Sequence, residues 1–153
     1  MEHLLAWGYL GLFLGAFLGA TIVPFSSEIL VSGMLLAKAS PFYILIVAST
    51  GNWLGSLSTY GIGWLGKWDW IEKWFKTPRE KIEQQQARIV KYGSILALLV
   101  WVPVAGDAFA LALGFYKVNF IKCSICMLIG KFLRFLIYIA LFEHVGSWLG
   151  FDI

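Results

Sequence analysis

The sequence has few charged residues, and this scarcity decides its class. Charged side chains make up 14% of the 153 residues and hydrophobic ones 59%, whereas ordinary soluble domains are roughly 25% charged. The mean hydropathy is +0.77, and several uncharged runs are long enough to cross a bilayer. This composition predicts an integral membrane protein. The length allows one membrane domain, residues 1–153, and no sizeable soluble module.

Histidine and cysteine are also scarce, with two residues of each. Cys123 and Cys126 form a C-x-x-C inside an apolar helical segment, so we interpret them as packing thiols rather than as a redox or metal pair. Ser26 and Ser27 lack a plausible base, because both histidines fall near segment ends. No nucleophile elbow, metal-ligand pair or phosphate-binding glycine loop occurs in the sequence. We therefore predict no enzymatic activity, no catalytic residue, no metal and no cofactor.

A proline motif occurs twice at a fixed separation. Pro24 is followed four residues later by Glu28, and Pro103, which is 79 positions further on, is followed at the same distance by Asp107. Each proline interrupts a long apolar run, and the repetition indicates an internal duplication. Without a gap, the same offset also aligns Lys38 with Lys117 and Gly51 with Gly130.

We interpret the chain as two repeats, at about residues 10–66 and 92–146, joined by an amphipathic charged linker at 67–91. One helix over residues 4–37 would be about 50 Å long. This exceeds a hydrocarbon core of about 30 Å but is too short for two crossings. A helix that enters the bilayer, breaks near mid-depth and returns to the same side fits this length. The breaks are expected at Pro24, Ser26 and Ser27 in the first repeat and at Pro103 and Gly106 in the second.

A segment of crossing length follows each predicted hairpin, at 42–66 and at 118–145. Ser40-Pro41 predicts a helix start with proline in the first turn, and Gly51 and Gly55 offer a face for close helix contact. The predicted fold is an all-α integral membrane protein with two inverted repeats, each a proline-broken re-entrant hairpin plus a transmembrane helix.

The linker is rich in basic residues and places one side of the protein in the cytoplasm. Residues 67–91 contain seven Lys and Arg residues and four acids, and the positive-inside rule assigns such a segment to the cytoplasmic side. We interpret it as a solvated interfacial segment and predict no nucleic-acid binding.

Four ionisable residues fall inside otherwise apolar segments: Glu28, Asp107, Lys131 and Arg134. A charge at a helix centre costs about 2.5–3.5 kcal/mol on insertion, so we expect these side chains to face inward and to pair. One interpretation is a structural ion cluster that holds the two halves together. In the other, the two acids carry protons, because a buried carboxyl beside a cation can titrate near physiological pH. Matched broken helices in inverted halves are typical of secondary transporters.

The two cations occur in one repeat only. Lys131 and Arg134 are three residues apart and share a helix face, while Asn52 and Gly55 take their places in the first repeat. Arg binds phosphate bidentately and Lys binds it as a point charge. We therefore expect Lys131, Arg134 and Asn52 to bind an anionic substrate, a lipid phosphate whose tails remain in the bilayer.

Five short motifs span nearly the whole chain. In order they are Pro24-x-Ser26-Ser27-Glu28, Gly51-Asn52, Tyr92-Gly93, Pro103-Val104-x-Gly106-Asp107 and Gly130-Lys131-x-x-Arg134. This set resembles the small YqaA-like branch of the DedA superfamily, whose members share the VTT, or SNARE-associated, domain. The resemblance implies two facing re-entrant helices, multi-pass insertion in the bacterial inner (cytoplasmic) membrane and proton-coupled movement of lipids.

The resemblance also implies site residues and substrates. An acid in the first re-entrant segment of larger members matches Glu28, and an arginine in their later helix resembles Arg134. Larger members carry another arginine where this chain has Gly106, and Lys131 would replace that charge. Larger members are associated with polyprenyl phosphate recycling and phospholipid flipping.

These observations lead to two hypotheses for the function. The first is a proton-coupled transporter or flippase of a lipid phosphate, either polyprenyl phosphate or a phospholipid. The alternative is a non-transporting membrane assembly or envelope-homeostasis factor whose charge cluster is structural. The expected partners are an anionic membrane lipid and protons, and a homodimer is plausible because each re-entrant hairpin must be shielded from lipid.

Overall fold

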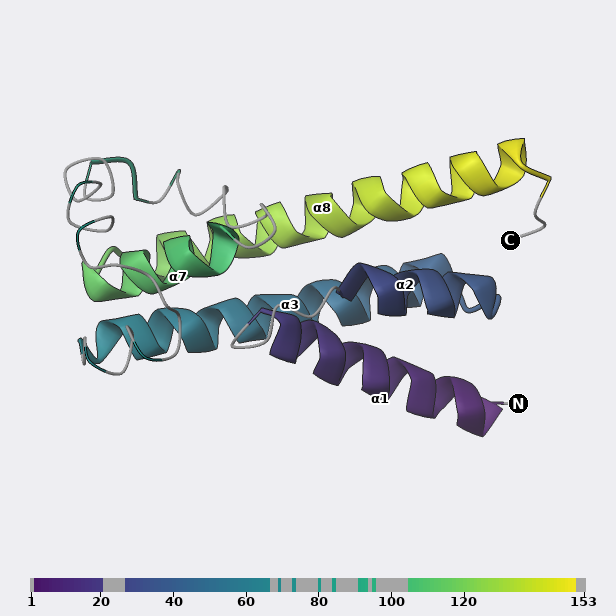
Figure 1. Ribbon diagram of the computed structural model, residues 1–153, viewed down its shortest axis with the longest axis horizontal. Coiled ribbons are helices and arrows are strands. Elements are labelled where there is room, and N and C mark those ends of the chain that lie inside the picture. The colour runs from purple at the N-terminus through teal and green to yellow at the C-terminus, as the bar shows by residue number, and fades with distance from the viewer. Residues whose placement is uncertain are drawn as a thin grey trace.

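Helices are the only regular secondary structure among the residues that the structure describes, and no strand occurs there. The computed structural model describes residues 2–20, 27–66 and 105–150, together with Asp69, Lys73, Glu80, Gln84, Lys91–Gly93 and Ile95. The prediction of an all-α fold is confirmed. The helices are α1 (Glu2–Gly19), α2 (Ser27–Leu36), α3 (Pro41–Trp64), α7 (Ala105–Phe115) and α8 (Phe120–Trp148) (Figure 1).

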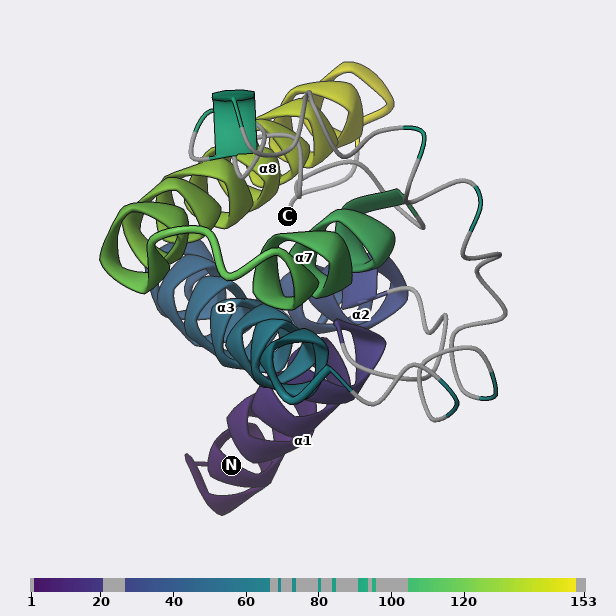
Figure 2. The same cartoon turned by 90° about the vertical axis from the view of Figure 1, so that its left-hand side faces the viewer.

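Two long helices, α3 and α8, run antiparallel along the length of the molecule (Figure 1). Helices α1 and α2 lie along the half of α3 that contains its N-terminus, and α7 lies along the other half. The view along the long axis shows α3 between α1 on one side and α7 and α8 on the other (Figure 2). Helix α3 is thus the central element, against which the others pack.

The turn between α2 and α3 recurs between α7 and α8. Lys38 and Lys117 both adopt positive φ, at 59° and 51°. The Lys38 amide donates to Leu35 and the Lys117 amide donates to Gly114, both at 2.9 Å. In each turn the next amide donates to the carbonyl oxygen five residues earlier, at 3.1 Å. These two hydrogen bonds are the pair that defines a Schellman motif at the end of a helix. Helices α3 and α8 then begin at Pro41 and at Phe120, 79 positions apart, which is the offset of the sequence motif.

Glycines allow α3 to touch two neighbouring backbones. A Cβ atom on Gly51 would lie 2.6 Å from the Phe13 carbonyl oxygen of α1, and one on Gly55 would overlap the Phe17 carbonyl oxygen. The close-contact face predicted for these two glycines is therefore confirmed. On the other half of α3, Gly63 meets the α7 backbone in the same way, and Gly114 of α7 meets the α3 backbone.

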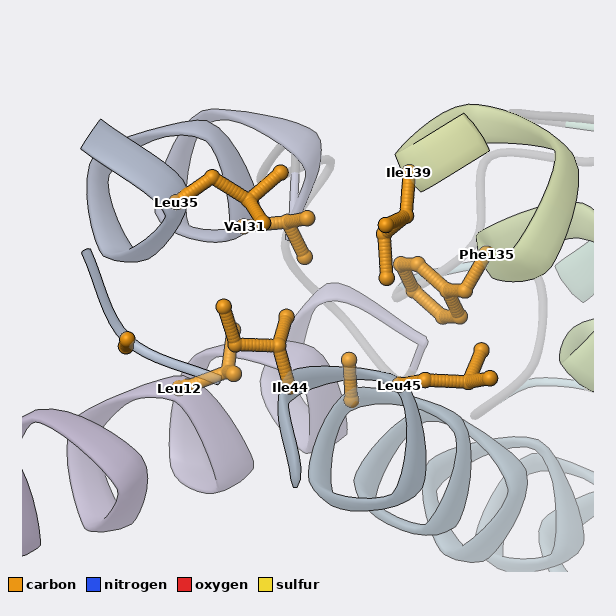
Figure 3. Close-up of a cluster of buried hydrophobic side chains, with 9 residues drawn as sticks. Leu12, Val31, Leu35, Ile44, Leu45, Phe135 and Ile139 are labelled. Atoms are coloured by element: carbon orange, nitrogen blue, oxygen red, sulfur yellow. The ribbon is translucent and has the colours of Figure 1, made fainter. Parts of the chain in front are cut away.

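Two apolar clusters fill the interior, one in each half of the molecule. The first joins α3, α7 and α8 and consists of Tyr60, Ala110, Ala112, Leu113, Cys123 and Met127. Cys123 is buried there as a free thiol, in agreement with its interpretation as a packing residue. The second joins α1, α2, α3 and α8 and includes Leu12, Val31, Leu35, Ile44, Leu45, Phe135 and Ile139 (Figure 3).

The outer surface of α8 is apolar. Its exposed side chains include Ile121, Ile125, Ile129, Leu133, Leu136, Ile137 and Leu141. Among the described helices, α8 alone is both long enough and apolar enough to cross a membrane, while the apolar helices at Ala6–Gly19 and Ser27–Leu36 are shorter. These features agree with the membrane character that the composition predicts.

Candidate functional site

An ion pair links α2 to the centre of α8. The Arg134 guanidinium contacts the Glu28 carboxylate. Arg134 has 14 residues of α8 before it and 14 after it, counting from Phe120 to Trp148. The side chains are 14% exposed for Arg134 and 22% for Glu28, so water has little access to the pair. The expectation that intramembrane acids and bases pair is confirmed for these two residues.

A second polar contact lies one helical turn further along both helices. The Ser32 and Tyr138 hydroxyls are 2.7 Å apart and share a hydrogen bond, and the Ser32 hydroxyl also reaches the Glu28 carbonyl oxygen at 2.9 Å. The Tyr138 ring stacks on Phe142, which fixes its direction. Helix α2 is therefore joined to α8 by two polar contacts one turn apart: residue 28 contacts residue 134, and residue 32 contacts residue 138.

Lys131 lies between the two apolar clusters. It is 2% exposed, although a Lys side chain is almost never fully buried in proteins unless it is paired. Met127, one turn before it, belongs to the first cluster, and Phe135, one turn after it, belongs to the second. On the face of α8 that packs into the protein, the cation therefore has an apolar residue one turn before it and another one turn after it. The cation lies at the level of the middle of the molecule.

Side chains of α3 cap the C-terminal end of α1. The Asn52 amide nitrogen donates to the Ala16 carbonyl oxygen at 2.9 Å, and the Thr59 hydroxyl donates to the Ala20 carbonyl oxygen at 3.0 Å. The last carbonyls of a helix have no partner within that helix, and in an apolar environment each needs a donor from elsewhere. Asn52 and Thr59 supply these donors.

A row of buried polar atoms on α3 has no hydrogen-bond partner among the residues that the structure describes. The atoms are the Ser49 hydroxyl, the Asn52 amide oxygen and the Ser56 hydroxyl. All three residues are 2% exposed or less. Spacings of three and four residues place them on one face of the helix. We call Ser49, Asn52 and Ser56 the α3 polar row.

The remaining predicted site residues fall at helix starts or outside the described residues. Ser27 is the first residue of α2 and is buried. Gly106 and Asp107 are the second and third residues of α7, so Asp107, like Glu28, lies in the first turn of its helix. An acid in the first turn is stabilised by the helix dipole. Pro24, Ser26, Pro103 and the Asp107 side chain lie outside what the structure describes.

The structure brings Glu28 and Arg134 together and buries Lys131 one turn before Arg134 on α8, whereas Asn52 lies at the middle of α3, where its amide contacts α1. Within the described ranges, no group of three His, Cys, Asp or Glu residues lies close enough to hold a metal ion. The arrangement offers two cations and one acid in a region with little water, together with hydroxyl and amide groups from α3. Such a set can bind an anion and can exchange a proton.

Sequence reasoning did not find three of the contributing residues: Ser32, Ser49 and Ser56. A single serine in an apolar helix is a weak signal, because its hydroxyl usually bonds to the carbonyl one turn earlier in the same helix. The spacing of Ser49, Asn52 and Ser56 on one face of α3 was the available indication. Their lack of partners appears only once α1 and α8 are in place.

Comparisons with known proteins agree with the architecture. Residues 23–144 match the VTT domain. The chain is 37% identical over 133 residues to a protein of Haemophilus influenzae described as uncharacterized, an alignment that covers 81% of this chain and 80% of the relative. It is 31% identical over 127 residues to Inner membrane protein YqaA of Escherichia coli and of Shigella flexneri, covering 81% of this chain and 83% of each relative. No solved structure matches the chain significantly. The chain therefore belongs to the VTT-domain, or DedA, family of membrane proteins and is similar to YqaA.

Proposed function

We propose that this protein is a proton-coupled transporter or flippase of a lipid phosphate. The observation that carries the proposal is the pairing of Glu28 with Arg134 at the midpoint of α8, the described helix that is long and apolar enough to cross a membrane. Lys131 lies one turn away and is also inside the protein. Three ionisable side chains at this depth are expensive, and such residues are typical of substrate and proton pathways.

The stability of the fold does not by itself explain the ion pair between Glu28 and Arg134. An ion pair in a low-dielectric site often stabilises a protein no better than apolar side chains of similar size. Helix α2 already contributes Val31 and Leu35 to an apolar cluster with α8 residues (Figure 3). The charges at Glu28 and Arg134 are therefore better explained by binding and proton exchange.

The ion pair suggests how proton and substrate are linked. Arg134 is held by Glu28 in this structure, so a phosphate that binds Arg134 competes with the Glu28 carboxylate. A proton on Glu28 removes the negative charge of its carboxylate. Arg134 can then bind the phosphate bidentately, and Lys131 can bind it as a point charge. Asp107 is the second proposed proton carrier, and Asn52 contributes to the substrate site.

The proposed topology has two inverted repeats, each a re-entrant hairpin followed by a crossing helix, in the bacterial inner membrane. It is supported by the identical turns at Lys38 and Lys117 and by the placement of α1 and α2 against one half of α3 and of α7 against the other (Figure 1). The relatives named Inner membrane protein YqaA support the location. A homodimer would shield the hairpins from lipid.

Aromatic and basic residues at one end of the molecule support a cytoplasmic assignment for that end. The Lys117 ammonium lies 5.5 Å from the centre of the Trp64 ring, and the Lys91 ammonium lies 5.2 Å from the Tyr92 ring. Gly93 packs against Val118, so the residues just after the linker lie beside the α7–α8 turn. Aromatic residues mark a membrane interface, and an excess of basic residues marks its cytoplasmic side.

The test is flipping of a fluorescent lipid phosphate in proteoliposomes, with and without a pH gradient. We expect flipping to follow the gradient in the wild type and to be abolished in Glu28→Gln, while the variant still inserts and folds. Glu143→Gln is the matched control, because Glu143 is also acidic but is exposed near the end of α8. Undiminished flipping in Glu28→Gln would contradict proton coupling through this residue.

A second candidate function is a non-transporting assembly or envelope-homeostasis role in which the charges are structural. The contacts from Glu28 and Ser32 to Arg134 and Tyr138 favour it, because they attach the short helix α2 to α8. This role predicts that Glu28→Gln and Arg134→Ala each lower stability, because removing one partner of a buried pair costs about 3–5 kcal/mol. It also predicts that the exchange Glu28→Arg with Arg134→Glu restores stability. A stable wild type that flips no lipid would favour this role.

A further inference from the structure

The α3 polar row, Ser49, Asn52 and Ser56, requires an explanation that the ion pair does not give. Its three oxygens have no hydrogen-bond partner in the described part of the chain, although each residue is at most 2% exposed. A buried polar group without a hydrogen bond is costly, and native proteins rarely tolerate one without a function. Three such groups on one helix face indicate that something else binds them.

Other hydroxyls in the same helices are satisfied by their own backbone. Ser32, Thr50 and Ser58 each donate to the carbonyl four residues earlier, at 2.9, 2.7 and 3.0 Å. The Ser49 and Ser56 hydroxyls could likewise donate to the carbonyl four residues earlier in α3. Neither hydroxyl has a hydrogen-bond partner among the described residues. The buried Thr59 hydroxyl also has partners, the Ala20 and Gly55 carbonyl oxygens, so Ser49 and Ser56 differ from the other serine and threonine hydroxyls of α3.

The row begins beside the cations of α8. The Trp53 indole nitrogen donates to the Ser124 carbonyl oxygen at 3.0 Å, and the helices are antiparallel (Figure 1). Ser49 lies four residues before Trp53, so it is level with Leu128, which lies four residues after Ser124. Leu128 is three residues from Lys131, which is roughly 4.5 Å along the helix axis at 1.5 Å per residue. Helical side chains lean toward the N-terminus, so the Lys131 side chain leans toward the level of Ser49.

The acceptor and donor groups of the row define the ligand chemistry. The Asn52 nitrogen already donates to the Ala16 carbonyl oxygen, so the remaining group of Asn52 is its amide oxygen, an acceptor, whereas the two serine hydroxyls can donate or accept. A neutral hydroxyl group satisfies both types. An ammonium group would be repelled by Lys131 and Arg134, and a second phosphate would find no positive charge in the row itself.

We propose that the α3 polar row is a subsite for the hydroxyl groups of a lipid head group whose phosphate binds Lys131 and Arg134. This rests on the proposed function and narrows its substrate to phosphodiester lipids with hydroxylated head groups. Ser49 and Asn52 contact the head group first, and Ser56, one turn beyond, contacts it as it moves along α3. The tails stay in the surrounding lipid.

The test compares three short-chain fluorescent lipids in proteoliposomes: phosphatidylglycerol, phosphatidic acid and phosphatidylethanolamine. The wild type is expected to flip phosphatidylglycerol fastest. The double variant Ser49→Ala, Ser56→Ala is expected to lower the ratio of phosphatidylglycerol to phosphatidic acid flipping by about three- to tenfold, as the loss of one or two neutral hydrogen bonds implies. Asn52 is left intact, because it also caps α1.

Ser58→Ala is the matched control, since Ser58 is exposed and its hydroxyl bonds to Leu54; it should keep the wild-type ratio. Ser49→Thr with Ser56→Thr retains both hydroxyls and should keep the preference. A wild type that flips phosphatidic acid as fast as phosphatidylglycerol, or a double variant with an unchanged ratio, overturns the subsite while the flippase function stands. If a folded wild type flips none of the three lipids but flips a polyprenyl phosphate, the subsite fails while the flippase function stands. If it flips no lipid phosphate at all, both fail.

Discussion

Lys38 and Lys117, 79 residues apart, occupy the same position in the same left-handed turn, with φ of 59° and 51°. A left-handed conformation costs a residue with a Cβ about 1–2 kcal/mol, and glycine is the usual residue at this place in a helix end. Both turns nevertheless carry lysine. The shared conformation places α2 before α3, and α7 before α8, in the same local geometry.

Replacing Lys38 with glycine should stabilise the protein by about 0.5–1 kcal/mol, because the relief of strain exceeds the entropy cost of glycine. Lys117→Gly should be close to neutral, since the contact of Lys117 with the Trp64 ring contributes about 0.5–1 kcal/mol that is lost. Thermal unfolding in detergent measures both. Lys122→Gly is the control, because Lys122 lies in α8 and glycine there should destabilise. A less stable Lys38→Gly protein would contradict the strain argument.

Alanine at Gly63 or Gly114 should separate α3 from α7. A Cβ at either position overlaps backbone atoms of the facing helix, which cannot move like a flexible side chain, so we expect a loss of about 1–3 kcal/mol. Gly61→Ala serves as the control, since a Cβ there meets nothing within 4 Å and should stabilise α3 by up to about 1 kcal/mol. Equal unfolding temperatures for Gly61→Ala and Gly63→Ala would count against this packing.

Thr59→Val keeps the shape of the side chain but removes its hydrogen bonds to Ala20 and Gly55. The expected cost is about 1–3 kcal/mol, because the Ala20 carbonyl is left without its donor. Hydrogen exchange should become faster in the last turn of α1 and remain unchanged in α8. Ser58→Ala, on the neighbouring exposed position, should change stability by less than about 0.5 kcal/mol. Uniformly faster exchange in every helix would indicate global destabilisation instead of local uncapping.

The hydrogen bond between Ser32 and Tyr138 can be isolated by a double-mutant cycle of Ser32→Ala and Tyr138→Phe. We expect a coupling free energy of about 0.5–1.5 kcal/mol, because the phenylalanine ring can still stack on Phe142. A cycle of Tyr138→Phe with Thr50→Val should give no coupling, since Thr50 bonds within its own helix. Zero coupling in the first cycle would remove this contact between α2 and α8.

Much of the fold follows from local sequence signals. The start of α3 at Pro41 follows from Ser40-Pro41, since proline is tolerated in the first turn of a helix. The close contact at Gly51 and Gly55 follows from their spacing. The inward direction of Lys131 follows from the cost of a charge in lipid. These signals depend on one segment and on the solvent around it.

The partners across helices could not be predicted in the same way. That Glu28 meets Arg134 was expected only as one pairing among four charged residues, and the contact of Ser32 with Tyr138 was not foreseen. Such contacts depend on how far α2 is shifted along α8, and no local pattern encodes this shift. The overlap of Gly114 with the α3 backbone depends in the same way on where α7 meets α3.

The capping of α1 by α3 has a consequence for biosynthesis. The donor for the Ala20 carbonyl, Thr59, is synthesised 39 residues later, which takes about 2–8 s at about 5–20 residues per second. During that interval the Ala20 carbonyl lacks this donor, and an unsatisfied carbonyl is not tolerated in lipid. The first helix must therefore remain at the insertion machinery or in contact with water until the third helix has emerged.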